Sequence, residues 1–204
     1  MNVPMSWLKQ YVSLDDIDLN TYIDAMTMSG TKVEAVEEIG KEITRVVAGK
    51  ILEESKHPNA DKLRIMKVDV NGDELLQIVT AATNVKVGDV VPVALDGATL
   101  AKGVVIKKGK LRGEVSEGMF CSVEELGFNA SDIEDAPEDG VYVFHQDITL
   151  GSDVKPYFGL GEHVVEYEVT SNRPDCFSII GIAREAAATF NRPFMFPKIE
   201  VKET

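Results

Sequence analysis

The side chains with the clearest potential for chemistry are basic residues grouped near the middle of the sequence. The chain has no acidic residue between Gly97 and Gly113, and this interval contains Lys102, Lys107, Lys108, Lys110 and Arg112. Lysine and arginine bind phosphate oxygens through charge-assisted hydrogen bonds, so a basic stripe on an acidic protein predicts a phosphate-contacting surface. A lone surface lysine usually serves only solubility. The prediction therefore depends on the cluster from Lys107 to Arg112.

No constellation for catalysis or metal binding accompanies this stripe. The sequence lacks a glycine-rich phosphate loop, and His57, His145 and His163 are scattered without an evident nucleophile or ligand set. Cys121 and Cys176 lie in apolar contexts, which favours buried reduced thiols over a disulfide or a zinc site. The acidic residues between 132 and 139 lack the spacing of a calcium loop. We therefore predict no catalytic residue and no metal site.

The distribution of charge matters more than its sum. The formal net charge is -13, and residues 121 to 175 carry 13 acidic but only 2 basic side chains. Residues 44 to 120 carry 12 basic and 10 acidic side chains. This balance argues against a general nucleic-acid binder and leaves the basic stripe as a local feature. The sequence contains neither a membrane-span candidate nor a signal peptide, which predicts a cytoplasmic protein without a membrane partner.

Short β-type segments surround the stripe. Strands are expected at residues 45–52, 63–70, 75–80, 90–95, 104–106 and 118–121. That number of short strands favours a small five-stranded oligonucleotide-binding barrel, with a β-sandwich as the structural alternative. Residues 44–119 contain no Phe, Tyr or Trp, so these residues are not expected to capture single-stranded DNA by stacking aromatic rings on its bases. Phosphate contact with a folded RNA needs no aromatic side chain.

The flanks of this region have a different pattern. We expect a short helix over residues 4–12, a second helix that Asp18 or Asn20 caps and Gly30 ends, and a strand over residues 31–37. Near the other end, a strand over residues 164–169 and a helix after the predicted cap Asp175 are expected. Trp7, Tyr11 and Tyr22 are interpreted as core residues. Neither flank is large enough to bury its apolar face alone, which indicates that the two flanks pack together.

Two segments carry a resemblance to a known family. His57-Pro58-Asn59-Ala60-Asp61-Lys62-Leu63 and the segment from Lys110 to Met119, followed by Cys121-Ser122, resemble the signature of a tRNA-binding barrel found in synthetase-associated and free-standing proteins. The flanking segments 6–12, 26–30, 170–176 and 181–185 resemble the amino-terminal part of the bacterial phenylalanyl-tRNA synthetase beta subunit. The sequence departs from the family pattern at Thr80-Ala81-Ala82-Thr83-Asn84, where cysteine-glycine-alanine-proline-asparagine is usual.

The resemblance implies an α+β fold in which an oligonucleotide-binding β-barrel is inserted into a small discontinuous α+β domain. The implied divisions are residues 1–40 and 152–195 for the discontinuous domain, 41–151 for the barrel and 196–204 for a linker to a missing domain. It also implies a non-catalytic fragment of a longer ligase. In that ligase an alpha subunit in an alpha2-beta2 assembly would activate the amino acid with ATP and magnesium, and this fragment would bind no cofactor.

Candidate tRNA-binding residues follow from the two segments, from the basic stripe and, for Asn84, from the partial match to the family pattern at residues 80–84. They are His57, Asn59, Lys62, Arg64, Asn84, Lys107, Lys108, Lys110, Arg112, Ser116, Glu117 and Met119. Gly113 and Gly118 bracket Ser116 and Glu117, which are expected on a loop. Asp61 and Glu117 would repel phosphate, so a role in shaping the loops stays open for them. Met119 could lie against a base or ribose, but a core position is the commoner case for methionine. Arg173 and Asp175 could serve an interface or pair locally. Three functions stay open: the tRNA-binding region of a synthetase beta subunit, a free-standing tRNA-binding protein, and a scaffold with little RNA contact.

Overall fold

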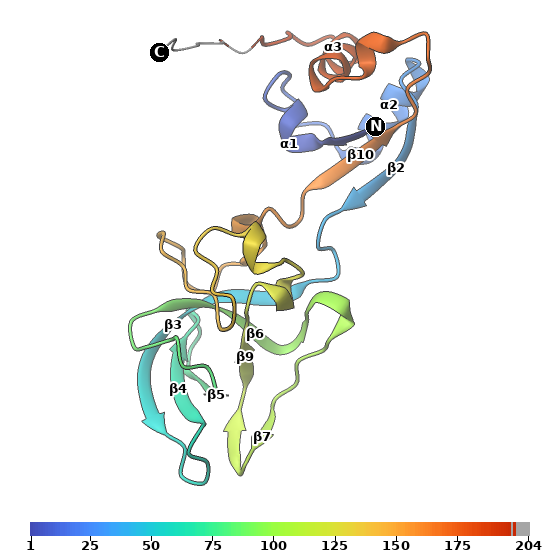
Figure 1. Ribbon diagram of the computed structural model, residues 1–204. Helices are drawn as coiled ribbons and strands as arrows, with labels where there is room; N and C mark the ends of the chain where they lie inside the picture. The colour runs from blue at the N-terminus through green and yellow to red at the C-terminus, as the bar shows by residue number, and fades with distance from the viewer. Residues whose placement is uncertain (197, 199–204) are drawn as a thin grey trace. The chain divides into compact units, whose positions relative to one another are not determined.

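The computed structural model describes residues 1–196 and 198 (Figure 1). The chain divides into two compact units, one formed by residues 40–160 and the other by residues 1–39 together with the residues from 161 onward. The domain bounds expected from the sequence, with the barrel at residues 41–151, remain a prediction.

The larger unit is built on an antiparallel sheet of five strands. These strands are β3 (Thr44–Lys56), β4 (Arg64–Asp69), β5 (Leu76–Thr80), β6 (Val90–Thr99) and β9 (Gly118–Phe120). Their order is β5-β4-β3-β6-β9, and β3 has a register irregularity against each of its two neighbours. Such irregularities bend and twist a strand. The sheet curls into a nearly closed barrel, which confirms the predicted α+β class with an oligonucleotide-binding type of barrel.

Residue type explains how this barrel fills its interior. In β4, Met66 and Val68 are buried while Ile65 and Lys67 are partly exposed, which is the alternation that the sequence shows. Gly49 allows β3 to approach its neighbours, because a Cβ atom there would lie 2.6 Å from a methyl carbon of Val93. The buried core comprises Ile51, Met66, Val68, Ile78, Val85, Val91, Val93, Phe120 and Val141.

The connection between β6 and β9 differs from its prediction. The strand expected at residues 104–106 does not form, and Val105 makes only one isolated bridge with Thr99 after the 3-10 helix η1 (Ala101–Gly103). A hairpin of β7 (Gly109–Leu111) and β8 (Glu114–Ser116) follows instead. Its two-residue turn is Arg112-Gly113 with φ of 52° and 102°. Positive φ at both positions is the requirement of a type I′ turn, and Gly113 meets it without a steric cost.

The rest of the larger unit contains little regular structure. It includes the 3-10 helices η2 (Glu124–Leu126), η3 (Ala130–Asp132) and η4 (Lys155–Phe158). Tyr142, Phe144 and Phe158 contact one another through their rings, with centroids 5.2 to 5.7 Å apart. These aromatic contacts supply a local core for a segment whose named elements are short 3-10 helices.

The smaller unit has a three-stranded antiparallel sheet in the order β1-β10-β2. Its strands are β1 (Asn2–Pro4), β2 (Val33–Glu38) and β10 (His163–Tyr167), and its helices are α1 (Met5–Leu8), α2 (Leu19–Met28) and α3 (Ile179–Thr189), with the 3-10 helix η5 (Pro174–Cys176). Side chains from both flanking segments share one core, and the hydroxyl groups of Tyr22 and Tyr167 are 2.6 Å apart within it. The predicted packing of the two flanks on each other is therefore confirmed.

Local predictions in this unit are partly corrected. The first helix ends at Leu8 rather than continuing to residue 12, and Trp7 is 54% exposed instead of buried because Leu8 takes the core position. Of the two predicted caps, Asp18 rather than Asn20 caps α2, by accepting the Thr21 N–H at 3.0 Å. Ser178, not Asp175, caps α3 by accepting the Gly181 N–H at 3.0 Å. Serine and aspartate are about equally good caps, so residue type alone does not choose between these two positions.

Two expectations concern the chain as a whole. Cys121 and Cys176 are both free and buried, as the apolar neighbours of each cysteine predicted. Within residues 1–196 and 198, no helix combines the length and the apolar character that crossing a membrane would demand. The expected linker at residues 196–204 lies mostly outside the described residues.

Candidate nucleic-acid interface

The two signature segments meet through one histidine. His57 is only 6% exposed, and its Nε2 atom lies 3.0 Å from the backbone oxygen of Leu111 in the hairpin. Its Nδ1 atom accepts the backbone N–H of Asn59 at 3.1 Å. A carbonyl can only accept and a backbone N–H can only donate, so this pair of bonds fits the tautomer with its proton on Nε2. His57 thus joins its own loop to the hairpin with both ring nitrogens occupied.

This contact places exposed polar and basic side chains at one end of the barrel. Figure 1 shows the β3–β4 loop and the β7 hairpin reaching the same end of the larger unit. A Cβ atom at Gly113 would lie 4.0 Å from the Asn59 side-chain nitrogen, so the tip of the hairpin is adjacent to the loop. The exposed members of the predicted set near these two segments are Asn59, Lys62, Lys107, Lys108, Lys110 and Arg112.

Lys108 differs from the other cations because it has an internal partner. Its Nζ atom lies 2.5 Å from Oε1 of Glu117, and its backbone N–H donates to Asp96 at 2.7 Å. The hydrogen bond from Lys108 and the one from the Gln77 backbone both lower the pKa of Glu117. The bond between Lys108 and Glu117 also raises the pKa of Lys108. The positive charge of Lys108 is therefore partly compensated within the protein, which makes it a weaker phosphate ligand than its neighbours.

Ser116 and Glu117 close the barrel at the edge of β5. Glu117 accepts the Gln77 N–H at 3.0 Å through Oε2, and its own N–H donates to the Gln77 oxygen at 2.8 Å. Ser116 Oγ accepts the Val79 N–H at 3.1 Å and donates to the Gly118 oxygen at 2.9 Å. The sequence placed both residues on a loop, whereas Ser116 belongs to β8 and is 5% exposed. Both side chains satisfy the unpaired edge of a strand.

Gln77 is a residue of this arrangement that the sequence did not reveal. Its side-chain amide donates to the Val115 oxygen at 2.9 Å. In addition, its backbone N–H donates to the Glu117 carboxylate and its backbone oxygen accepts the Glu117 N–H. Gln77 lies within a β-type segment and has no motif around it, so only its contacts identify it. The four residues Gln77, Val79, Ser116 and Glu117 are called the barrel closure below.

Arg64 and Asn84 act on the loop that follows β5. The Arg64 guanidinium forms an ion pair with Glu54 at 2.9 Å and also donates to the backbone oxygens of Ala82 and Val85. The Asn84 amide donates to the Val141 oxygen at 2.8 Å and accepts the Val141 N–H at 3.2 Å. Both side chains hold backbone in place. Met119 is partly buried in β9, where it pairs with Ala94 of β6.

The described residues contain one group with possible metal ligands, in the smaller unit. Asp175, Cys176 and Glu185 place ligand atoms within 4.8 Å of one another. Arg173 already supplies the positive charge there, because its Nη2 atom lies 2.9 Å from Asp175 and 2.8 Å from Glu185. Its hydrogen bond lowers the pKa of Asp175 to about 2, and burial raises the pKa of the Cys176 thiol to about 11. The group is best described as an arginine-centred ion-pair network.

Comparison with known proteins supports a nucleic-acid interface. Residues 46–153 match the family described as "Putative tRNA binding domain". The whole chain is 50% identical to the phenylalanine--tRNA ligase beta subunit of Clostridium acetobutylicum, and 43% identical to that of Fusobacterium nucleatum, covering 25% of each relative. For Clostridium tetani the identity is 47% over 98% of this chain and 24% of the relative. The chain thus spans about a quarter of the length of these curated relatives.

One solved structure provides a further, weak likeness. The C-terminal domain of Plasmodium vivax p43 aligns with a TM-score of 0.30 and 26% sequence identity, over 37% of this chain and 45% of that chain. A score this low does not establish a common arrangement of the elements.

Proposed function

This chain belongs to the tRNA-binding domain family, and from that premise we propose that its barrel binds the sugar-phosphate backbone of tRNA. The proposed contacts are the exposed side chains Lys62, Lys107, Lys110 and Arg112, with Asn59 as a neutral donor. His57, Arg64, Asn84, Ser116 and Glu117 would act indirectly, because their polar atoms are engaged with the protein itself. They are proposed as positioning residues.

The observation that carries this proposal is the bond between His57 and Leu111. It fixes the hairpin to the β3–β4 loop across 54 residues of sequence, so that the basic side chains of both segments are presented together. A surface whose backbone is already ordered loses less conformational entropy when a ligand binds. The lysine and arginine side chains can then bind phosphate groups without a sequence-specific base contact.

The longer relatives suggest a setting for this activity. They are named phenylalanine--tRNA ligase beta subunits. We propose that this region helps to hold tRNA for aminoacylation in the cytoplasm, within a protein that assembles with a synthetase alpha subunit. ATP and magnesium would be bound elsewhere in that assembly, and the region itself would be non-catalytic.

The test is a tRNA titration of the wild-type chain and of a Lys107→Gln, Lys110→Gln, Arg112→Gln variant, at about 50 mM and about 200 mM salt. Glutamine preserves polarity while removing charge. We expect the wild type to bind with a salt-dependent affinity. The variant should bind more weakly, with a slope of log affinity against log salt that is shallower by about 2, because up to three phosphate contacts are lost.

A Lys41→Gln, Lys86→Gln, Lys155→Gln variant is the matched control, since it removes three positive charges from the same unit at positions outside the two signature segments and the basic stripe. An equal loss in both variants would show that only net charge matters. If the wild type does not bind tRNA even at low salt, the barrel is a scaffold. The strongly acidic segment 121–160, with nine acidic side chains and one basic, is the observation that favours this second candidate.

A further inference from the structure

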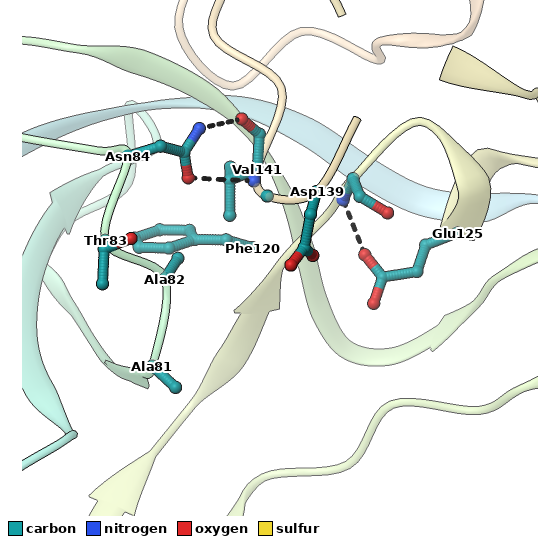
Figure 2. A pocket seen from close by; sticks show the side chains of 10 residues that line it. Ala81, Ala82, Thr83, Asn84, Phe120, Glu125, Asp139 and Val141 are labelled. Atoms are coloured by element: carbon teal, nitrogen blue, oxygen red, sulfur yellow. Dashed lines mark hydrogen bonds between the residues drawn. The ribbon is translucent and has the colours of Figure 1, made fainter. Parts of the chain in front are cut away.

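A separate pocket lies between the loop after β5 and the segment that follows β9 (Figure 2). It has a volume of about 410 Å³, which is within the range of small-ligand sites. Its lining residues are Ala81, Ala82, Thr83, Asn84, Phe120, Ser122, Glu125, Asp139, Gly140 and Val141. We call it the acidic pocket, because two of these residues are acidic and none is basic.

The two sides of the acidic pocket differ in chemistry. Figure 2 shows Ala82, Thr83 and the ring of Phe120 on one side, and the carboxyl groups of Asp139 and Glu125 on the other. Glu125 accepts the Ser122 N–H at 2.6 Å through Oε2, which orients its carboxylate. This combination of an apolar wall and two carboxylates, one of them oriented, suits a cation carried on an apolar stem.

The walls of the pocket are fixed before any ligand binds. The Asn84 amide makes two hydrogen bonds with the backbone of Val141, at 2.8 and 3.2 Å, and so ties one wall to the other. Gly140 has φ of 133°, and a Cβ atom there would lie 2.6 Å from Asn84 Oδ1. Arg64 donates to the backbone oxygens of Ala82 and Val85 and so holds the loop. A preformed pocket avoids much of the ordering cost of binding.

The negative charge in and around the acidic pocket disfavours binding of nucleic-acid phosphates there, in contrast to the hairpin. Residues 121–160 carry nine acidic side chains and one basic side chain, Lys155. A phosphate entering the pocket would meet Asp139 and Glu125 without a compensating cation among the lining residues. A basic group would be attracted by the same field. Charge complementarity therefore favours a cationic ligand over an anionic one.

We propose that the acidic pocket binds an arginine side chain of a partner protein. Arginine has a three-carbon stem for the apolar wall and a guanidinium with five N–H donors for two carboxylates. The pocket would thus be a protein-docking site, distinct from the tRNA-binding hairpin and independent of whether that hairpin binds RNA. Its acidic surroundings steer a basic partner surface toward it.

The experiment uses the ¹⁵N-labelled chain and the peptide acetyl-Gly-Arg-Gly-amide, titrated at constant ionic strength. The readout is the chemical shift of the backbone amides of Thr83, Ser122 and Val141. The peptide acetyl-Gly-citrulline-Gly-amide is the uncharged isostere, and adenosine monophosphate tests a nucleotide. We expect saturable shifts with the arginine peptide only. Saturable shifts with the citrulline peptide or the nucleotide, or no shifts with the arginine peptide, would overturn the proposal.

Matched variants test the carboxylates. In a Glu125→Gln, Asp139→Asn variant, the amide oxygen of the introduced glutamine can still accept the Ser122 N–H, so the wall is retained while two charges are lost. We expect the dissociation constant of the arginine peptide to rise about tenfold or more. A Glu134→Gln, Asp147→Asn variant loses the same charge outside the lining and should change it less than about twofold. If both variants raise the dissociation constant equally, the peptide responds only to the overall negative charge of the unit, and a specific site is contradicted.

Discussion

At the scale of single residues, the structure separates side chains that face solvent from side chains that hold the interface together. Lys110 and Arg112 are exposed on the hairpin, while His57 is buried against the same hairpin. Both kinds belong to the signature segments, because a binding surface needs ordered backbone as well as ligands. The residues of a motif therefore need not all touch the partner.

A substitution of His57 tests whether this residue positions the hairpin without contacting phosphate. A His57→Ala variant loses the bonds with Leu111 and Asn59, and we expect the free energy of unfolding to fall by about 1 to 3 kcal/mol. Its affinity for tRNA should fall too, but the salt slope should be unchanged because no phosphate-contacting charge is removed. Urea unfolding and tRNA titration measure these two quantities.

The control for this variant is His145→Ala, which removes an exposed histidine of the same unit. It should leave both stability and tRNA affinity close to those of the wild type. If His57→Ala also lowers the salt slope, His57 takes part in phosphate binding directly and its proposed positioning role is wrong.

At the scale of elements, the barrel closure explains why the Ser116-Glu117 segment lies where it does. The outer edge of β5 would leave the N–H groups of Gln77 and Val79 without partners, and Glu117 and Ser116 accept them. Gly118 then lets β9 approach β6, since a Cβ atom there would lie 2.5 Å from the Ala94 oxygen. Closure of the sheet and placement of the hairpin are thus achieved by neighbouring residues.

A Ser116→Ala substitution tests the closure. It leaves the buried N–H of Val79 without its acceptor, and we expect the free energy of unfolding to decrease by about 1 to 3 kcal/mol in urea. A Ser55→Ala variant, at an exposed position on β3, should change it by less than about 0.5 kcal/mol. Equal values for the two variants would mean that the Ser116 hydroxyl does not stabilise the closed barrel.

At the scale of the whole molecule, charge is unevenly distributed along the chain, and the smaller unit is built from two separate segments. Within residues 40–160, the basic side chains of the hairpin and the carboxylates that line the acidic pocket come from different segments of the chain. The smaller unit forms its sheet from β1, β2 and β10, which come from both sides of the larger unit in the sequence. Its core accordingly requires both flanking segments.

This topology makes a prediction about isolated pieces. A protein of residues 40–160 contains the whole five-stranded sheet and its hydrophobic cluster. We expect it to unfold cooperatively in urea and to bind tRNA within about twofold of the full chain, as compact units with their own cores do. Residues 1–39 alone should stay unfolded, because β10 is absent. A 40–160 piece that folds but loses tRNA affinity would show that the flanks contribute to binding.

The sequence by itself determined the main strands of the barrel, the helix that follows the candidate caps Asp18 and Asn20, and the basic stripe, because periodicity, capping residues and local charge are short-range features. It identified the residue types of the candidate interface but not their roles. Only the tertiary structure decided that His57 bonds to Leu111, that Ser116 bonds to Val79 and that Arg64 holds the loop at Ala82. Partners 18 to 54 residues away are set by how strands pair in three dimensions, which local sequence patterns do not encode.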